Sequence, residues 1–317
     1  IQKITSKTRS DVLTRSFPVD RQRWFAESAA VAIGFDFHAG RLDTTTHPFC
    51  TTLGPGDIRL TTRYNPKFFN EAFFGVLHEA GHGMYEQGLP AEHFGLPVGS
   101  YCSLGIHESQ SRFWENQVGR SRPFWDHFFP RLKQAFPGVV DDVTEDEFFR
   151  AINEVRPSYI RVEADEATYN LHVVLRFELE VDLLSGNLAV ADLPGAWNER
   201  FAKLLGMTPT TDAEGCLQDT HWSFGGIGYF PTYTLGNLYA AQLCEAATRE
   251  LGESVLHAAI RAGDFSPLRD WLRSRIYCHG RRFRAGELCR RATGSALSAK
   301  PFLRYLSGKF SPLNPVC

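Results

Sequence analysis

The chain has 317 residues, of which 43% are hydrophobic and 22% are charged, a balance typical of a globular protein with one large domain or two smaller ones. Its formal net charge of -2 leaves no basic surplus, which argues against binding to nucleic acid or to an anionic membrane. No apolar run approaches the roughly 18 residues that a membrane-spanning helix needs, so we expect no membrane partner.

The predicted elements are mostly helices, in which apolar residues recur at three- and four-residue steps. In chain order, we predict helices over residues 24–33, 65–87, 103–118, 158–184, 193–205, 235–251 and 253–262. Residues 41–64 are dense in Thr, Pro and Gly and can supply a short β-ribbon near the second helix. Residues 215–234, rich in Gly and aromatics, are predicted to form a structured loop. The sequence therefore predicts a mostly α fold.

The start of the chain and its cysteines bear on processing and location. The chain begins with Ile1 and lacks a signal-peptide pattern, so we expect a trimmed chain or one part of a longer product. Seven cysteines are scattered without a C-x-x-C pair. This spacing favours reduced thiols and a cytoplasmic location.

The strongest local pattern is H-E-x-x-H, which falls in the second predicted helix. Residues four apart share one helix face, so the imidazoles of His78 and His82 can reach a single Zn²⁺. Glu79 adjoins the first ligand and is the candidate general base that takes a proton from water. Gly81 and Gly83 flank His82, although each costs a helix interior about 1 kcal/mol relative to alanine, so we expect another segment to pack closely there. The alternative is an ordinary pair of histidines on an amphipathic helix.

A catalytic zinc usually has three protein ligands and one open position. Glu108 lies 26 residues after His82, on the next predicted helix, and an antiparallel return over that distance would bring it beside the histidine pair. His107 is a rival ligand, but adjacent helical residues point about 100° apart, so only one of the two can serve. Cys102 is a softer alternative ligand.

Two further sets of side chains are candidates around such a metal. The H-E-x-x-H pattern is typical of enzymes that hydrolyse peptide bonds. That reaction needs hydrogen-bond donors besides the metal, and His221, Tyr229 and Tyr233 in the predicted Gly-rich loop can supply them. The same aromatic residues can equally form an ordinary core cluster. Metal-bound imidazoles donate their other N–H to a carboxylate or carbonyl, for which Asp165 and Asp219 are candidates.

Five motifs in chain order resemble the carboxypeptidase Taq family of zinc metallocarboxypeptidases. The matching segments are residues 57–61 (D-x-R-x-T), 78–82 (H-E-x-x-H), 107–110 (H-E-S-Q), 160–165 (I-R-x-x-A-D) and 215–222 (G-x-x-Q-D-x-H-W). The resemblance runs from about residue 17 to about residue 312. It implies that Glu108 is the third metal ligand.

The resemblance also implies a fold and an activity. It implies a helical zincin-like metallopeptidase with a deep central groove, usually a homodimer, that removes single residues from peptides with a free C-terminus and has broad specificity. An arginine fork suits a carboxylate, and the resemblance assigns Arg59 and Arg161 to that group of the substrate. It makes His221, and more weakly Tyr229, a substrate or transition-state contact, with Tyr233 as a further substrate contact. Each arginine also has an aspartate within four positions, so an ordinary ion pair is the alternative.

One departure concerns length. Members of that family carry an additional N-terminal helical region that covers part of the groove, and the match here begins close to the start of the chain. We therefore expect a single catalytic domain over residues 1–317 without the N-terminal lid. The leading hypothesis is an active metallocarboxypeptidase. Its rivals are an endopeptidase or dipeptidase with the same site, and a non-catalytic zinc-binding scaffold or partner subunit. Co²⁺ or Mn²⁺ can replace Zn²⁺ with these ligands.

Overall fold

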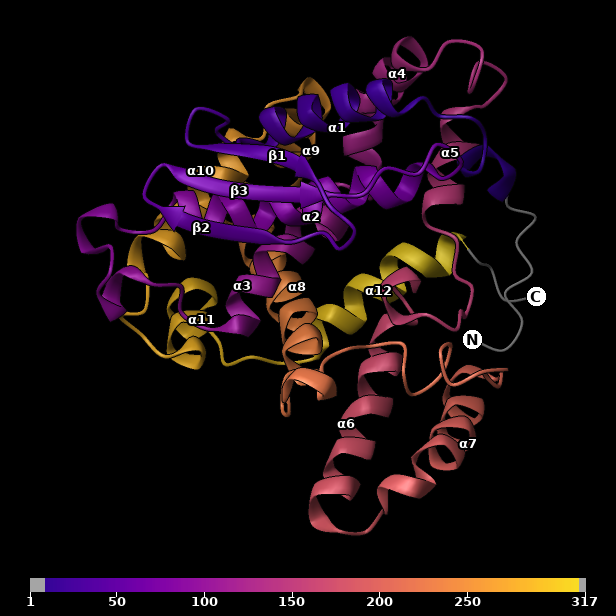
Figure 1. Cartoon of the computed structure of the whole chain (residues 1–317). Helices are drawn as coiled ribbons and strands as arrows, with labels where there is room; N and C mark the ends of the chain where they lie inside the picture. Colours follow the sequence, from indigo (N-terminus) through magenta and orange to yellow (C-terminus); the bar gives the residue numbers. More distant parts are fainter. Residues whose placement is uncertain (1–8, 314–317) are drawn as a thin grey trace. The chain divides into compact units, whose positions relative to one another are not determined.

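The computed structural model describes residues 9–313, which fall into two compact units. The smaller unit is the segment Asn153–Leu235, and the larger unit combines the chain before and after it. Their elements are labelled in Figure 1. The larger unit contains α1 (Val19–Ile33), β1 (Gly40–Thr44), β2 (Cys50–Gly54), β3 (Asp57–Thr62), α2 (Phe69–Gln87), α3 (Leu104–Arg112), α4 (Arg122–Ala135), α5 (Glu145–Ile152), α9 (Glu253–Ala262), α10 (Ser266–Arg275), α11 (Ala285–Thr293) and α12 (Lys300–Leu313). The smaller unit contains α6 (Tyr169–Ser185) and α7 (Leu193–Leu205), and α8 (Pro231–Leu251) begins in its last residues.

A small mixed sheet lies beside α2 in the larger unit (Figure 1). Its strand order is β1-β3-β2, with β1 parallel and β2 antiparallel to β3. The side chains of Leu42, Ile58 and Leu60 are buried, so one face of the sheet belongs to the core. The prediction of a mostly helical chain with a small β element near the helix that carries His78 and His82 is confirmed, and this element is a sheet of three strands.

Aromatic rings fill the core of the larger unit and hold α2 in place. The rings of Phe69 and Phe73 on α2 are stacked with centroids 5.1 Å apart, and the ring of Phe25 from α1 stacks on Phe73 at the same distance. Trp125 of α4 packs against Phe73 at 5.4 Å. Because each such ring buries a large apolar surface, α2 is anchored on several sides before any polar contact is considered.

One predicted helix is wrong at its start. The helix expected over residues 158–184 begins at Tyr169, because the side chain of Asp165 binds the local backbone instead. Its Oδ1 atom accepts hydrogen bonds from the backbone N–H groups of Ala167 and Thr168, both at 2.9 Å, and its Oδ2 atom accepts one from the Thr168 hydroxyl at 2.7 Å. Such side-chain bonds compete with helix formation, so the apolar spacing before Asp165 is misleading.

The remaining element predictions differ in accuracy. Helices α7 and α9 have the predicted bounds, and α1, α2 and α8 are found with different starting residues. The predicted loop over residues 215–234 is irregular apart from a short 3₁₀ turn and the start of α8. Helices α4, α5, α10, α11 and α12 were not predicted.

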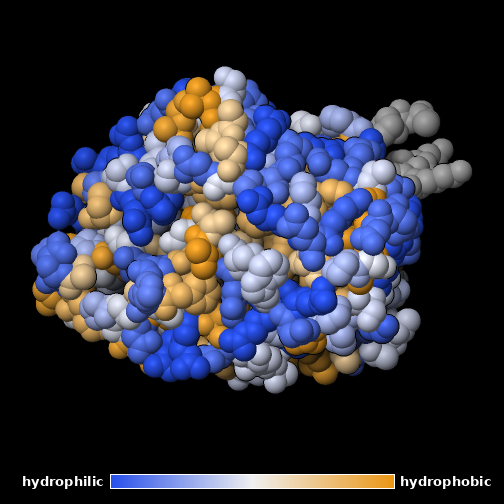
Figure 2. Space-filling model, turned by 90° about the horizontal axis from the view of Figure 1, so that it is seen from above, coloured by the Kyte–Doolittle hydropathy of each residue, from blue (hydrophilic) through white to orange (hydrophobic). Residues whose placement is uncertain are grey.

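Hydrophilic and hydrophobic areas are interspersed over the face seen in Figure 2. Within residues 9–313, no helix combines the length and the apolar character that a membrane crossing requires. Cys317 lies outside the described residues, and the free thiols within them are Cys50, Cys102, Cys216, Cys244, Cys278 and Cys289.

Candidate metal centre

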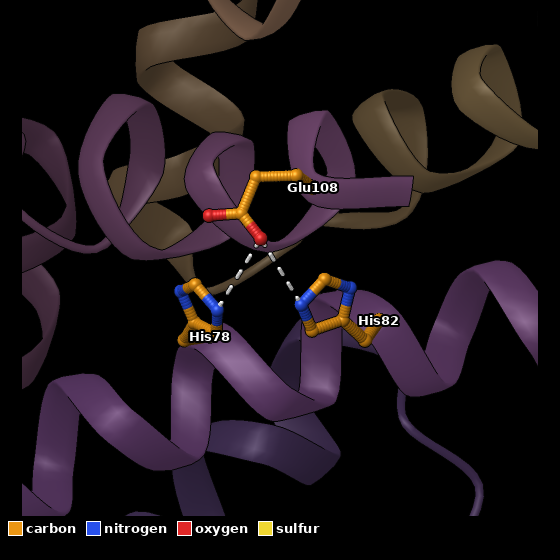
Figure 3. A group of neighbouring side chains, drawn as sticks. All are labelled: His78, His82 and Glu108. Atoms are coloured by element: carbon orange, nitrogen blue, oxygen red, sulfur yellow. Dashed lines mark ion pairs between the residues drawn. The ribbon is translucent and has the colours of Figure 1, made fainter. Parts of the chain in front are cut away.

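Helix α2 carries His78 and His82 one turn apart, and the carboxylate of Glu108 from α3 points toward both rings (Figure 3). The Oε2 atom of Glu108 lies 3.9 Å from Nε2 of His78 and 3.5 Å from Nε2 of His82. One potential ligand atom from each of the three residues lies within 4.8 Å of the other two, so the group could hold a metal ion. The three residues predicted as ligands are therefore brought together.

Glycines allow the surroundings of α2 to approach it closely. A Cβ atom on Gly81 would lie 2.5 Å from the carbonyl oxygen of Gln110 and 2.7 Å from Cα of Ser111, both backbone atoms of α3. A Cβ atom on Gly83 would lie 2.9 Å from the side chain of Leu60 on β3. The expectation that another segment packs against these glycines is confirmed, with α3 on one side and the sheet on another.

Helix α3 is positioned at its start and along its side. The Ser103 hydroxyl accepts a hydrogen bond from the backbone N–H of Ile106 at 3.1 Å, a side-chain cap that begins the helix. Gly236 of α8 lies against Glu108, where an added Cβ would come within 2.7 Å of the Glu108 Cβ. Glu108 is thus held between α2 and α8, with little room to turn away from the histidines.

A second group of charged side chains surrounds the three candidate ligands. Glu115 binds His78, with Oε2 to Nδ1 at 2.8 Å. The guanidinium of Arg112 donates to Oε1 of Glu108 at 2.8 Å and to Oε2 of Glu115 at 3.1 Å. Glu115 lies in a π-helical continuation of α3, Phe113–Val118, and such segments are frequent at functional sites. Arg112 therefore connects the carboxylate ligand to the carboxylate that orients His78.

The rival ligands occupy other positions. The Nδ1 atom of His107 lies 2.6 Å from Nδ1 of His82, and its Nε2 atom lies 2.7 Å from Oε1 of Glu86. His107 therefore contacts His82 at the ring nitrogen that does not face Glu108. The buried thiol of Cys102 donates to the carbonyl oxygen of Phe283 at 3.2 Å and is not part of the three-residue group.

The predicted partners of the metal-facing imidazoles are wrong. Asp165 and Asp219 were candidates, but both bind groups within the smaller unit. Glu115 and His107 take that position instead. Glu115 could have been found from sequence, because it follows Glu108 by seven residues and two helical turns return to the same face.

Burial and neighbouring charges set the protonation of the site. Burial raises the pKa of Glu79 to about 7, and burial lowers the pKa of His82 to about 3. Burial opposes ionisation of Glu108, but the charges of Arg112 and His78 outweigh it and hold the pKa of Glu108 below its ordinary value. A neutral imidazole and an ionised carboxylate are the forms that ligate a metal.

Arg161 lies in the smaller unit and is only 5% exposed. Its guanidinium donates to both carboxylate oxygens of Asp219, with the shortest distance 2.7 Å, and to the Tyr169 hydroxyl at 2.7 Å. The Nε atom of Arg176, which is fully buried, donates to Asp219 at 2.6 Å. The alternative of a helical ion pair between Arg161 and Asp165 is not observed, because those residues do not lie on a common helix.

Three more predicted site residues lie beside Arg161. The Nε2 atom of His221 is 2.9 Å from the Tyr233 hydroxyl, and the rings of His221 and Tyr229 have centroids 5.2 Å apart. The guanidinium carbon of Arg161 lies 4.6 Å from the centroid of the Tyr233 ring. Within the smaller unit, the structure groups all four predicted residues into one polar and aromatic cluster.

Arg59 differs from Arg161 in its exposure. It lies on β3 of the larger unit, its side chain is 40% exposed, and its Nε atom donates to Asp57 at 2.8 Å. The ion-pair alternative is therefore observed. Exposed pairs of this kind contribute only about 0–1 kcal/mol, so this one can open readily for another carboxylate.

The site defines a class of protein before any relative is considered. Two histidines one helical turn apart and a carboxylate from the next helix match the zinc ligands of H-E-x-x-H metallopeptidases. The buried glutamate beside the first histidine completes the pattern. Residues 1–310 match the family described as carboxypeptidase Taq (M32) metallopeptidase. The chain belongs to this family.

Curated relatives and solved structures agree with this assignment. The chain is 53% identical over 304 residues to thermostable carboxypeptidase 1 of Thermus thermophilus, covering 96% of this chain and 59% of that protein. It is 44% identical over 308 residues to carboxypeptidase 1 of Bacillus subtilis, covering 97% and 61%. The crystal structure of an M32 carboxypeptidase from Deinococcus radiodurans matches with a TM-score of 0.95 and 48% identity, covering 98% of this chain and 62% of that one. The chain thus spans about three-fifths of the length of these relatives.

Proposed function

We propose that this chain carries the catalytic metal centre of a zinc metallocarboxypeptidase, which hydrolyses the last peptide bond of substrates with a free C-terminus and broad side-chain specificity. The observation that carries the proposal is the convergence of His78, His82 and Glu108 in a member of a metallocarboxypeptidase family. The relatives named above are carboxypeptidases by name.

The donor set fits a zinc ion. With metal–ligand distances of about 2.0–2.1 Å and tetrahedral angles, ligand atoms lie about 3.3 Å apart. The distances from Glu108 Oε2 to the Nε2 atoms of His82 and His78 are 3.5 and 3.9 Å, so small side-chain movements suffice. Both Nδ1 atoms are already bound by other side chains, which leaves the Nε2 atoms for the metal. Co²⁺ and Mn²⁺ accept the same donors.

The bound ion would supply Lewis acidity, lowering the pKa of water and polarising the scissile carbonyl. Glu79 would hold the proton taken from water, because a carboxyl with a pKa of about 7 both accepts and releases protons near neutral pH. Arg112 and Glu115 would orient Glu108 and His78 through the hydrogen bonds described above. Each chemical role then has a side chain with suitable burial and protonation.

Substrate recognition is proposed for the predicted arginines and for the cluster of the smaller unit. Arg161 is buried and pre-oriented by its aspartate partner, as a residue that binds a carboxylate bidentately should be. We propose that Arg59 also contacts the substrate carboxylate. His221 and Tyr229 would stabilise the transition state and Tyr233 would contact substrate, since these side chains offer hydrogen-bonding groups next to Arg161.

The test of this proposal compares matched peptides. Zinc-loaded protein is incubated with peptides that end in a free carboxylate and with the same peptides amidated at the C-terminus, and the products are identified by mass. We expect loss of single C-terminal residues from the free acids only. Equal cleavage of the amides would contradict carboxylate-directed action and favour an endopeptidase, whereas release of two-residue products would favour a dipeptidase.

A non-catalytic zinc-binding scaffold or partner subunit is the second candidate, and it is kept because the chain spans only about three-fifths of its relatives. It predicts one bound zinc without turnover, unchanged by Glu79→Gln. The homodimer, the groove, the single domain over residues 1–317 and the cytoplasmic location stay predictions. Light scattering of the purified chain tests the first of these directly.

A further inference from the structure

A chain of hydrogen bonds leads away from the ring nitrogen of His82 that does not face Glu108. Nδ1 of His82 lies 2.6 Å from Nδ1 of His107, and Nε2 of His107 lies 2.7 Å from Oε1 of Glu86. The hydroxyl of Thr52 on β2 donates to Oε2 of Glu86 at 2.9 Å. The side chains of His82, His107 and Glu86 are 13%, 16% and 12% exposed, so water competes little for these bonds.

The position of each proton in this chain follows from the partners. An ionised carboxylate only accepts hydrogen bonds, so Glu86 requires a proton on Nε2 of His107. Two ring nitrogens 2.6 Å apart share a single proton, and an imidazole whose one proton is on Nε2 has only a lone pair at Nδ1. The proton therefore sits on Nδ1 of His82. That places the lone pair of His82 on Nε2, which faces Glu108.

The opposite direction of the chain would disable the site. If Nδ1 of His107 carried the proton, His82 would have to accept it and would carry its own proton on Nε2. An imidazole protonated at Nε2 cannot use that atom as a metal ligand. Glu86 thus decides whether His82 can bind a metal ion, although its carboxylate is hydrogen-bonded to His107 and not to His82.

The other metal-facing histidine has no such intermediate. Nδ1 of His78 is bound directly by Glu115 at 2.8 Å. Glu86 follows His82 by four residues on the same helix, yet its carboxylate contacts His107 on α3 rather than the His82 ring. The imidazole of His107 spans this gap, and it ties α2, α3 and strand β2 together at the metal site.

We propose that His107 and Glu86 are positioning residues that fix His82 in the tautomer with a free Nε2 lone pair, and that metal affinity depends on this two-membered relay. The inference rests on the proposed metal-binding function. His107, which the sequence suggests only as a rival ligand, thus has a separate role in holding the ring of His82.

The direct test is the tautomer of each histidine in the unmutated protein. The 317-residue chain labelled with ¹⁵N-histidine is studied without metal, and long-range proton–nitrogen spectra report which ring nitrogens are protonated. We expect His107 to be protonated on Nε2 alone and His82 on Nδ1 alone. A proton on Nδ1 of His107 in the metal-free protein, with or without one on Nε2, would overturn the inference, and Zn²⁺ binding measured separately would show whether the proposed function still holds. Failure of the protein to bind Zn²⁺ at all would overturn both this inference and the proposed function.

Variants provide an independent test through zinc affinity, measured by chelator competition. His107→Leu removes both hydrogen bonds and should weaken Zn²⁺ binding about 10- to 100-fold. His107→Gln keeps an acceptor oxygen and a donor nitrogen and should restore affinity to within about threefold of the unmutated protein. The exposed His38 offers a matched control, and His38→Leu should leave affinity unchanged.

Folding is checked from the circular dichroism of each metal-free variant. Unchanged affinity in a folded His107→Leu protein would refute the relay. So would a His107→Gln protein that binds as weakly as the leucine variant, because the ring shape and not its hydrogen bonds would then matter. If His107→Leu does not fold, the glutamine variant and the spectra of the unmutated protein decide.

Discussion

Replacing Gly81 with alanine should force α3 away from α2 and weaken the metal centre. The added methyl would meet the carbonyl oxygen of Gln110 at 2.5 Å and Cα of Ser111 at 2.7 Å. Both are backbone atoms, so no side-chain rotation relieves the clash. The helix carrying Glu108 would have to shift relative to the two histidines.

The magnitude follows from two opposing effects. Alanine in place of glycine stabilises a helix interior by about 1 kcal/mol. Overpacking costs about 1–3 kcal/mol, and an unyielding backbone places Gly81→Ala at the upper end of that range. The free energy of unfolding should therefore fall by about 2 kcal/mol. Gly75 on the same helix is the matched control, because an added Cβ would meet only the Thr62 hydroxyl, at 3.6 Å. Gly75→Ala should raise the free energy of unfolding by up to about 1 kcal/mol.

Urea unfolding of the metal-free proteins, followed by circular dichroism, gives the two changes in stability. Chelator competition then gives the zinc affinity of each variant, which should fall for Gly81→Ala and stay unchanged for Gly75→Ala. The reasoning is refuted if both variants shift the unfolding midpoint in the same direction and bind zinc equally well.

Three further predictions concern catalysis, pH and substrate binding. Glu79→Gln should keep zinc but lose about 100- to 10,000-fold in peptide hydrolysis, and retained turnover would exclude it as the base. Burial alone would raise the pKa of Asp219, but its bonds to Arg161 and Arg176 lower it to about 2. This carboxylate therefore stabilises the fold by roughly 2 kcal/mol above about pH 4, and that contribution is lost as the pH falls toward 2. Asp219→Asn should lower the free energy of unfolding by about 3–5 kcal/mol at neutral pH, because buried guanidinium charges remain unpaired. The stability of this variant should also fall less steeply as the pH is lowered, and an equally steep fall would contradict the assignment. Arg59→Ala should change stability by less than about 1 kcal/mol while reducing the preference for free-acid over amidated peptides, a preference that stays intact if the residue makes only its ion pair.

The metal group was predictable because its geometry is local. His78 and His82 share a helix face by spacing alone, and the flanking Gly81 indicated the close approach of another segment, which the structure identifies as α3. The N-cap at Ser103 places the start of that helix within one residue of its predicted position. Only the choice of Glu108 over its neighbour required the family resemblance in addition to helical geometry.

The outer hydrogen bonds were not predictable, because they depend on how helices rotate about their own axes. The relay from His82 through His107 depends on the side that α3 turns toward α2, which sequence spacing does not determine. Likewise, the partner of Arg161 is 58 residues away in sequence, at Asp219, and not at the helical distance of four that the pattern suggested. The error arose at Asp165, whose side chain binds the backbone and delays the start of α6.

The central claim is that one metal ion is held by residues of two adjacent helices. A crystal soaked in Zn²⁺ and measured at the zinc absorption edge tests it most directly, because anomalous scattering locates the ion without reference to any mechanism. We predict one strong peak at about 2.0–2.1 Å from Nε2 of His78, Nε2 of His82 and a carboxylate oxygen of Glu108. A peak elsewhere, or one coordinated by His107 in place of Glu108, would contradict it.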